Sequence, residues 1–310
     1  MKFLSGIYAS VTGARNSLYD THFLKARKLS WPVISVGNIS TGGSGKTPFV
    51  IMLGELLAEK QYWFDVLSRG YRRKTRGALS VKTNGSPEEY GDEPLLIARR
   101  LGCPVIVGED RYAAGQYAEQ AYGAQANAAH LLDDGFQHRG LHRDFDIVLV
   151  NREDLEDTLL PVGRLREPLS ALRRADAVVV DPEFPIHELP EGNFQVWRVE
   201  RKIEVPSLNN PVIAFCGIAR PQRFFSELRK SGLDVREEIA FRDHYRYSIK
   251  DVDRLASLQK RIKESSLVTT EKDSINLGPH FERLKPVVVP MQMRLLERES
   301  ALKFMLERMP

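Results

Sequence analysis

The stretch SVGNISTGGSGKTPFV, residues 35–50, constrains the fold of this chain more than any other feature. Its glycines and serine leave the backbone nearly bare, so consecutive N–H groups can turn inward and bind an anion. Lys46 would then place a cation at the β- and γ-phosphates, and Thr47 a hydroxyl at Mg²⁺. The stretch predicts a phosphate-binding loop for a nucleoside triphosphate, formed by Gly42, Gly43, Ser44, Gly45, Lys46 and Thr47.

The flanking sequence matches this interpretation. WPVISVG is typical of a short buried strand and PFVIMLGELLAEK of an amphipathic helix, which is the strand–loop–helix context that the motif requires. One position departs from the full pattern G-x-x-x-x-G-K-[ST], because Ser40 stands where the first glycine is usual. The alternative is a glycine-rich turn followed by a chance lysine.

Strand-like and helical segments alternate along the chain. PVISV, WFDVLS, PVIVG, AHLLDD, FDIVLV and DAVVV are separated by helical patterns such as DEPLLIARRLG, and a new alternating series begins at PVIAFCGI. This alternation predicts an α/β fold, a mostly parallel P-loop NTPase-like sheet flanked by helices. We expect a boundary near residue 200, with a kinase-type domain over 1–200 and a smaller α/β domain over 201–310, whose last helix can pack back on the first.

Composition limits the kinds of protein and cellular compartment that fit this chain. The chain has 310 residues and two distant cysteines, Cys103 and Cys216, which support neither a disulfide framework nor a zinc site. We find no apolar run of membrane-spanning length and no signal peptide, so we expect a chain that is neither secreted nor membrane-spanning.

The net charge of +4 resides in the first 30 residues, which hold five basic side chains and one acidic side chain. The same segment carries apolar residues on one helical face, namely Phe3, Leu4, Ile7, Tyr8 and Val11. Such a helix either packs on the core of its own domain or lies in a membrane interface, and the pattern alone favours neither.

A second chemical signal is AAHLLDDGFQHR, in which an apolar strand ends in Asp133 and Asp134. Carboxylates at the carboxyl end of a strand beside a phosphate loop can hold Mg²⁺ directly or through water. Aspartates are also common turn residues, so the interpretation depends on the phosphate loop that precedes them. With that loop present, we predict a metal site here.

Two further residues are candidates for proton transfer. Asp92 stands at the start of a helix, where an aspartate is often only an N-cap, and His244 lies in FRDHYRYS in the second half of the chain. Phosphoryl transfer to a hydroxyl needs a carboxylate or an imidazole that accepts the proton. Neither residue is diagnostic by itself.

Taken together and in order, these motifs resemble the tetraacyldisaccharide 4'-kinases, which phosphorylate the lipid A precursor of Gram-negative bacteria. The resemblance covers nearly the whole chain and rests on PVISVGNISTGGSGKTP, SRGYRR, GDEP, LLDDGFQHR, GRLREPLSALRRAD, GIARPQRFF, DHY and TTEKD.

The resemblance implies ATP and Mg²⁺ as cofactors and a tetraacyldisaccharide 1-phosphate as the lipid acceptor of the γ-phosphate. It implies a catalytic dyad of Asp92 and His244 from different domains, assisted by Lys46, and a metal or phosphate site of Thr47, Asp133, Asp134 and Glu167. It further implies a peripheral enzyme on the cytoplasmic face of the bacterial inner membrane. No nucleic acid or protein partner is implied.

Two other classes of P-loop protein serve as alternatives. One is an ATPase or GTPase that acts on a protein partner, and the other is a nucleic-acid-dependent ATPase. The guanine-reading N/T-K-x-D is absent, TTEKD being a near miss, and no Cys/His cluster suggests a metallochaperone. The basic cluster between Arg69 and Arg76 suits one local anion better than a polyanion, since the rest of the chain is balanced in charge.

Overall fold

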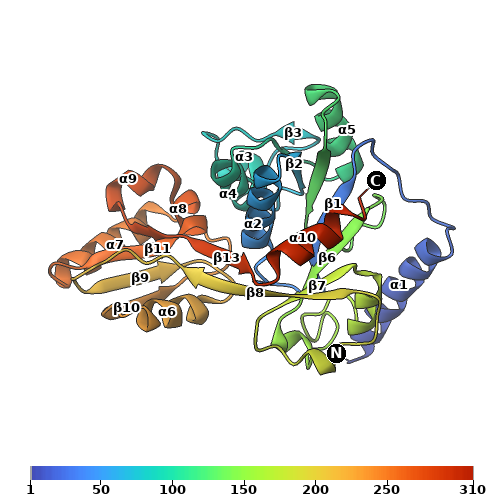
Figure 1. Cartoon of the computed structure of the whole chain (residues 1–310). Coiled ribbons are helices and arrows are strands. Elements are labelled where there is room, and N and C mark those ends of the chain that lie inside the picture. Colours follow the sequence, from blue (N-terminus) through green and yellow to red (C-terminus); the bar gives the residue numbers. More distant parts are fainter. Residues whose placement is uncertain (1, 310) are drawn as a thin grey trace.

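The computed structural model describes residues 2–309, which form two α/β units of unequal size (Figure 1). The larger unit is built on a nine-stranded sheet with the order β13-β8-β7-β6-β1-β5-β2-β4-β3. Only the β3–β4 and β8–β13 pairs are antiparallel, so the predicted mostly parallel sheet is confirmed. The strands are β13 (Met291–Leu295), β8 (Gln195–Ile203), β7 (Ala177–Val180), β6 (Phe145–Leu149), β1 (Val33–Asn38), β5 (Ala128–Asp133), β2 (Trp63–Ser68), β4 (Val105–Val107) and β3 (Leu79–Ser80).

Helices cover both faces of the large sheet. One face packs its apolar side chains against α2, α4 and α10, and the other packs partly against α5. Nine residues of α2 are buried, which explains why its sequence is apolar nearly all round. The helices of this unit are α1 (Lys2–Asp20), α2 (Lys46–Glu59), α3 (Pro87–Tyr90), α4 (Asp92–Leu101), α5 (Arg111–Tyr122) and α10 (Arg298–Leu306).

Strand β1 is the centre of the large sheet. All six of its residues are buried, and it pairs in parallel with β5 on one side and β6 on the other. In this register Val36 lies beside Asp133. The carboxyl ends of β1 and β5 therefore reach the same edge of the sheet, where ligands bind in open α/β folds.

The smaller unit is a four-stranded parallel sheet with the order β10-β9-β11-β12. Alternate residues of β9 face opposite ways, so one face buries side chains against α6 and the other against α7, α8 and α9. The elements are β9 (Val212–Cys216), α6 (Pro221–Lys230), β10 (Val235–Ala240), α7 (Ile249–Arg261), β11 (Ser266–Thr270), α8 (Glu271–Leu277), α9 (Phe281–Leu284) and β12 (Val287–Val289).

An antiparallel ribbon of β8 and β13 joins the two units (Figure 1). The chain leaves the large sheet along β8 and returns along β13, so the boundary expected near residue 200 lies within β8. After β13, α10 packs Ala301, Leu302 and Met305 into the core of the large unit. The smaller unit is thus held by two strands rather than by a single linker.

Gly37 in β1 offers a test of this packing, because a Cβ there would lie 2.5 Å from the Cβ of buried Phe136. We expect Gly37→Ala to destabilise the large unit by about 1–3 kcal/mol through overpacking. Urea unfolding followed by tryptophan fluorescence measures this. Gly13→Ala is the control, since nothing lies within 4 Å of that position on α1. An unchanged urea midpoint in Gly37→Ala would contradict the described packing.

Candidate active site

The loop between β1 and α2 has the geometry expected of a phosphate cradle. Gly42 and Gly45 adopt φ angles of 85° and 87°, which glycine tolerates best. Gly45 is the N-cap residue of α2 and has no side chain to bond the first helical amides, so these amides can bind an anion. The Nζ of Lys46 donates to the Oδ1 of Asn38 at 3.1 Å, which holds the ammonium over the loop.

Asp134 faces this ammonium. Its Oδ1 lies 3.4 Å from the Nζ of Lys46, and its two oxygens accept hydrogen bonds of 3.0 and 2.9 Å from Arg166. Burial alone would raise the pKa of Asp134, but Lys46 and Arg166 lower it to about 2. Asp134 is therefore a carboxylate that holds the lysine of the loop in place.

The neighbouring residue, Asp133, has a raised pKa where Asp134 has a lowered one. Its Oδ2 accepts from the hydroxyl of Ser68 at 2.9 Å, while the buried Oδ1 has no hydrogen-bond partner among the described residues. Burial first, and then the charges of Glu93 and Asp134, raise the pKa of Asp133 to about 7. A cation beside this unpartnered oxygen would stabilise the charged form.

These residues fit one Mg²⁺ that is shared with a nucleotide. Within residues 2–309, no group of three or more His, Cys, Asp or Glu side chains is arranged to hold a metal ion alone. Mg²⁺ in kinases, however, is usually bound by one or two carboxylates together with substrate phosphates and water. The unpartnered oxygen of Asp133, next to Asp134 and within reach of the charge of Lys46 in the phosphate loop, suits that arrangement.

Glu167 has a different environment from the other three predicted metal residues. Its carboxylate accepts hydrogen bonds from Asn16 at 2.6 Å, Arg174 at 2.8 Å and Gln137 at 3.1 Å. These contacts tie Glu167 to α1 and to the segment that follows β5. Its predicted part in the metal site stays a prediction, and the contacts support a role in holding the surrounding segments.

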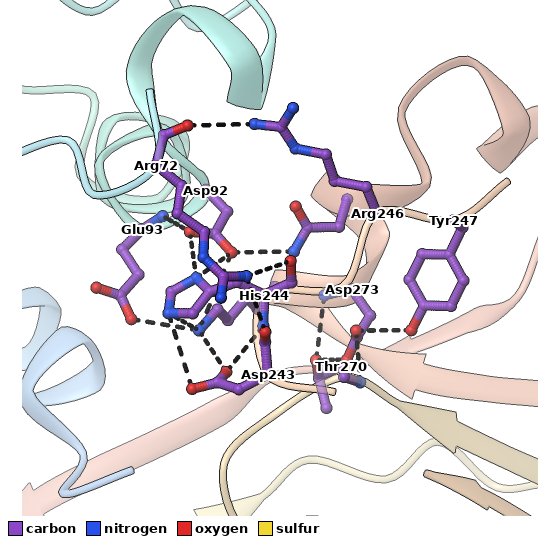
Figure 2. Close-up of polar contacts among 12 residues, drawn as sticks. Arg72, Asp92, Glu93, Asp243, His244, Arg246, Tyr247, Thr270 and Asp273 are labelled. Carbon is purple, nitrogen blue, oxygen red and sulfur yellow. Dashed lines mark hydrogen bonds and ion pairs between the residues drawn. The ribbon is translucent and has the colours of Figure 1, made fainter. Parts of the chain in front are cut away.

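Asp92 and His244 meet across the two units (Figure 2). The Nδ1 of His244 lies 2.8 Å and 3.0 Å from the two oxygens of Asp92, and Asn276 of α8 donates to Asp92 at 3.0 Å. Burial alone would raise the pKa of Asp92, but the hydrogen bond from His244 and the charge of Lys272 hold it well below its usual range. The N-cap residue of α4 is Gly91, so capping does not explain Asp92.

Arginines of both units form hydrogen bonds with the backbone near the contact between His244 and Asp92. Arg72 of the large unit donates to the carbonyl oxygens of Asp243 and His244, at 3.1 and 3.2 Å, and Arg246 donates back to the carbonyl of Arg72 at 3.3 Å (Figure 2). His244 has a φ of 58°, a conformation that a non-glycine residue rarely adopts. These contacts hold the imidazole against Asp92 with no further closure of the two units.

A cavity lies between the phosphate loop and the smaller unit. A ligand that fills it touches both units, because its walls come from the loop, from the β8–β13 ribbon and from α4, α6 and α8. Apolar side chains that suit a planar base line part of it, next to basic groups that suit phosphates. The apolar ones are Leu96, Ile203, Ile218, Phe224, Val289 and Met291, and the basic ones are Lys46, Arg201, Arg220, Arg223 and Lys272.

The basic cluster between Arg69 and Arg76 is only partly open to solvent. The side chain of Arg73 is 2% exposed, bonds the carbonyl of Gly77 and pairs with Glu109 at 2.9 Å. Arg72 binds the smaller unit as described. Arg69, Lys74 and Arg76 are exposed and are the members that can bind an anion from outside.

Helix α1 turns its polar face inward and its apolar face outward. Tyr8 donates to the carbonyl of Arg166 at 3.0 Å, and Asn16 contacts Glu167. Leu4, Ile7, Val11 and Leu18 are 53%, 48%, 64% and 40% exposed. The side chain of Phe3 lies outside the described residues. No helix within residues 2–309 is long and apolar enough to cross a membrane.

Three residues that contact the predicted ones were not expected from the sequence, namely Arg166, Lys272 and Asn276. Lys272 and Asn276 are four residues apart on α8 and so share one face of that helix. TTEKD, which places Lys272 just after a strand, carried a signal for that residue, because the carboxyl ends of parallel strands are where ligands bind. Nothing in the local sequence marks Arg166 as a partner of Asp134.

Comparison with known proteins gives consistent matches. The family model for tetraacyldisaccharide-1-P 4'-kinase matches residues 1–310. A tetraacyldisaccharide 4'-kinase of Koribacter versatilis is 48% identical, covering 97% of this chain and 96% of the relative. One from Aquifex aeolicus is 44% identical, covering 79% and 81%. A crystal structure of an "apo" form of LpxK from Aquifex aeolicus in complex with ATP superposes with a TM-score of 0.81 at 37% identity, covering 99% and 98% of the two chains.

Proposed function

The chain belongs to the tetraacyldisaccharide-1-P 4'-kinase family, and we propose from this premise which of its residues carry out the reaction. It is an ATP-dependent kinase of lipid A biosynthesis, which transfers the γ-phosphate to the 4'-hydroxyl of a tetraacyldisaccharide 1-phosphate. The observation that carries the proposal is the Asp92–His244 pair beside the nucleotide cavity. A kinase whose acceptor is a hydroxyl needs a group that takes the proton of that hydroxyl, and this pair can supply it.

His244 is the better proton acceptor of the pair. Asp92 already accepts hydrogen bonds from His244, Asn276 and a backbone amide, and its lowered pKa makes it a weak base. It therefore orients the ring and stabilises the imidazolium that forms. The Nε2 of His244 takes the proton as the 4'-oxygen attacks the γ-phosphorus and the bond to ADP breaks.

The phosphate loop would hold and polarise the triphosphate. The amides of the loop and Lys46 bind the β- and γ-phosphates, where charge develops during transfer. Thr47, Asp133 and Asp134 would hold Mg²⁺, which neutralises phosphate charge when it is bound. Asp134 has a second function, since it fixes the position of Lys46.

We further propose that the enzyme binds the cytoplasmic surface of the inner membrane through α1. ATP is supplied on that side, and the acylated acceptor resides in the bilayer. The outward apolar face of α1 supports this location, because four large exposed side chains on one helix face favour an interface with lipid. Anionic lipid would add attraction to the exposed basic residues of the N-terminal segment.

The function is tested by incubating the enzyme with ATP labelled at the γ-phosphate and purified tetraacyldisaccharide 1-phosphate. We expect label on the 4'-oxygen, and a loss of about 10²-fold or more in Lys46→Ala, because charge stabilisation at the γ-phosphate is removed. Lys60→Ala, at the other end of α2, is the matched control. Release of the label only as inorganic phosphate would contradict the proposed transfer.

The pair is tested by a double-mutant cycle. Asp92→Asn and His244→Ala should each lower kcat by about 10²–10⁴-fold with little change in the affinity for ATP. The double variant should be scarcely worse than either single one, because both residues serve one proton transfer. An Asp92→Asn variant that keeps the parent kcat would remove Asp92 from the mechanism.

The membrane role of α1 is tested by Ile7→Asp combined with Val11→Asp. We expect this variant to lose flotation with anionic vesicles and to show a raised KM for the lipid but not for ATP, since charges cost apolar burial at the interface. Ser10→Asp combined with Ser17→Asp adds the same charge beside the apolar face and is the control. Equal flotation of the two variants would refute membrane binding through this face.

A further inference from the structure

The inward face of helix α1 is bonded to two adjacent residues beside the proposed metal site. The hydroxyl of Tyr8 donates to the carbonyl of Arg166 at 3.0 Å. The amide of Asn16 donates to the Oε2 of Glu167 at 2.6 Å. The helix whose apolar face is open to lipid therefore also contacts the segment that packs against the catalytic carboxylates.

The first of these contacts leads to the phosphate loop through Asp134. The guanidinium of Arg166 bonds both oxygens of Asp134, and the Oδ1 of Asp134 lies 3.4 Å from the Nζ of Lys46. Tyr8 therefore restrains the backbone of the residue whose side chain fixes Asp134. A shift of that backbone would move the carboxylate that holds the lysine of the loop.

The second contact leads to the same lysine through Gln137. The Nε2 of Gln137 donates to the Oε1 of Glu167 at 3.1 Å and to the carbonyl of Asn38 at 2.9 Å. The Oδ1 of Asn38 in turn accepts from the Nζ of Lys46. Glu167 is only 1% exposed, so its charge depends on the hydrogen bonds that it receives, including the one from Asn16. Both routes from α1 thus end at Lys46.

Polar contacts hold α1 on the protein in place of apolar packing. None of residues 4–20 is fully buried, and none belongs to a cluster of buried apolar side chains. Hydrogen bonds that replace bonds to water add little stability each, and elements with few buried apolar contacts are the first to open. Gly6 and Gly13 lower the helix propensity further. The docked helix is therefore an element that a surface outside the protein can stabilise.

Both faces of α1 depend on its helical form. Half-buried polar side chains recur every three or four positions, at Ser5, Tyr8, Thr12, Asn16 and Tyr19. The same geometry gathers the exposed apolar side chains on a different face. A bilayer binds the helical form in preference to a frayed one, because only the helix presents a continuous apolar face. By this difference in affinity, lipid shifts α1 toward the conformation that bonds Arg166 and Glu167.

We propose that Tyr8 and Asn16 are positioning residues that couple lipid binding by α1 to the alignment of Lys46. The proposal rests on membrane binding through α1. A docked α1 fixes Arg166 and Glu167, and through them both groups that bond the ammonium of the loop. Phosphate transfer is then fastest at the bilayer, where the acceptor resides, because alignment of the reacting groups lowers the barrier.

The test is hydrogen exchange, followed by mass spectrometry, in peptides that cover residues 134–139 and 164–168. Exchange is measured with and without vesicles of phosphatidylethanolamine and phosphatidylglycerol that contain no acceptor, and flotation reports how much protein is bound. We expect the vesicles to slow exchange in these peptides of the parent by about 5-fold or more, as for other coupled sites. Tyr8→Phe combined with Asn16→Ala should float equally and show no slowing.

Ser10→Ala is the matched control for this double variant. It removes a hydroxyl of α1 that bonds the carbonyl of Gly6 within the same helix, so the slowing should persist. Tyr8→Phe alone takes the place of the double variant if thermal unfolding shows that the latter is not folded. Slowing of parent size in the floating variant would mean that lipid shields these peptides directly, and its absence in the floating parent would make α1 an anchor alone. Either result overturns the proposal.

A kinetic measurement separates coupling from anchoring. At saturating acceptor in vesicles, the double variant should lose about 10-fold or more in kcat, as when a partner that orients the ligands of a metal is removed. Its KM for the lipid should stay near the parent value, whereas loss of anchoring raises that KM. If the parent does not float, the membrane role of α1 fails and this proposal fails with it. If the parent floats and the double variant keeps the parent kcat, only the coupling fails.

Discussion

The hydrogen bond between Asp92 and His244 is the contact on which the rest of the site depends. The two residues are 152 positions apart, and each belongs to a different unit. Asp92 is fixed at the start of α4 against the large sheet, whereas His244 is fixed by the smaller sheet and by Arg72. The β8–β13 ribbon holds the two units at the separation that lets this bond form (Figure 1).

The acidic residues of the site differ in pKa, and these differences indicate what each carboxyl group can bind. Asp133 and Asp134 are neighbours in the chain, yet burial leaves the pKa of Asp133 near 7 while two cations hold that of Asp134 near 2. Within the described part of the chain, Asp133 thus has an oxygen free for a cation, and Asp134 is an ionised carboxylate that also fixes the position of Lys46. Beside His244, the hydrogen bond from the imidazole and the charge of Lys272 hold the pKa of Asp92 below its usual range, so Asp92 stays a carboxylate. In both places a lysine determines what the neighbouring acids can do.

Local patterns predicted the phosphate loop and the mostly parallel sheet, because loop chemistry and strand alternation depend on consecutive residues. The pairing of Asp92 with His244 was implied only by the family resemblance. The contacts of Lys272 and Arg166 were not predictable, since each joins segments that only the folded chain brings together. Periodicity found the apolar face of α1 but could not tell its direction, because core and lipid favour the same pattern. The pairing of β13 with β8 depends on contacts between distant segments, which a single sequence does not reveal, whereas packing of the last helix on the first domain was among the expectations.

The most direct test of this account is nitrogen NMR of the His244 ring in the enzyme without substrates, assigned by comparison with His244→Ala. We predict that the Nδ1 of His244 carries a proton in slow exchange with solvent, because this nitrogen is bonded to the buried carboxylate of Asp92. A ring that carries its proton on Nε2, or one that exchanges rapidly between tautomers, would contradict the contact between the two units and the mechanism built on it.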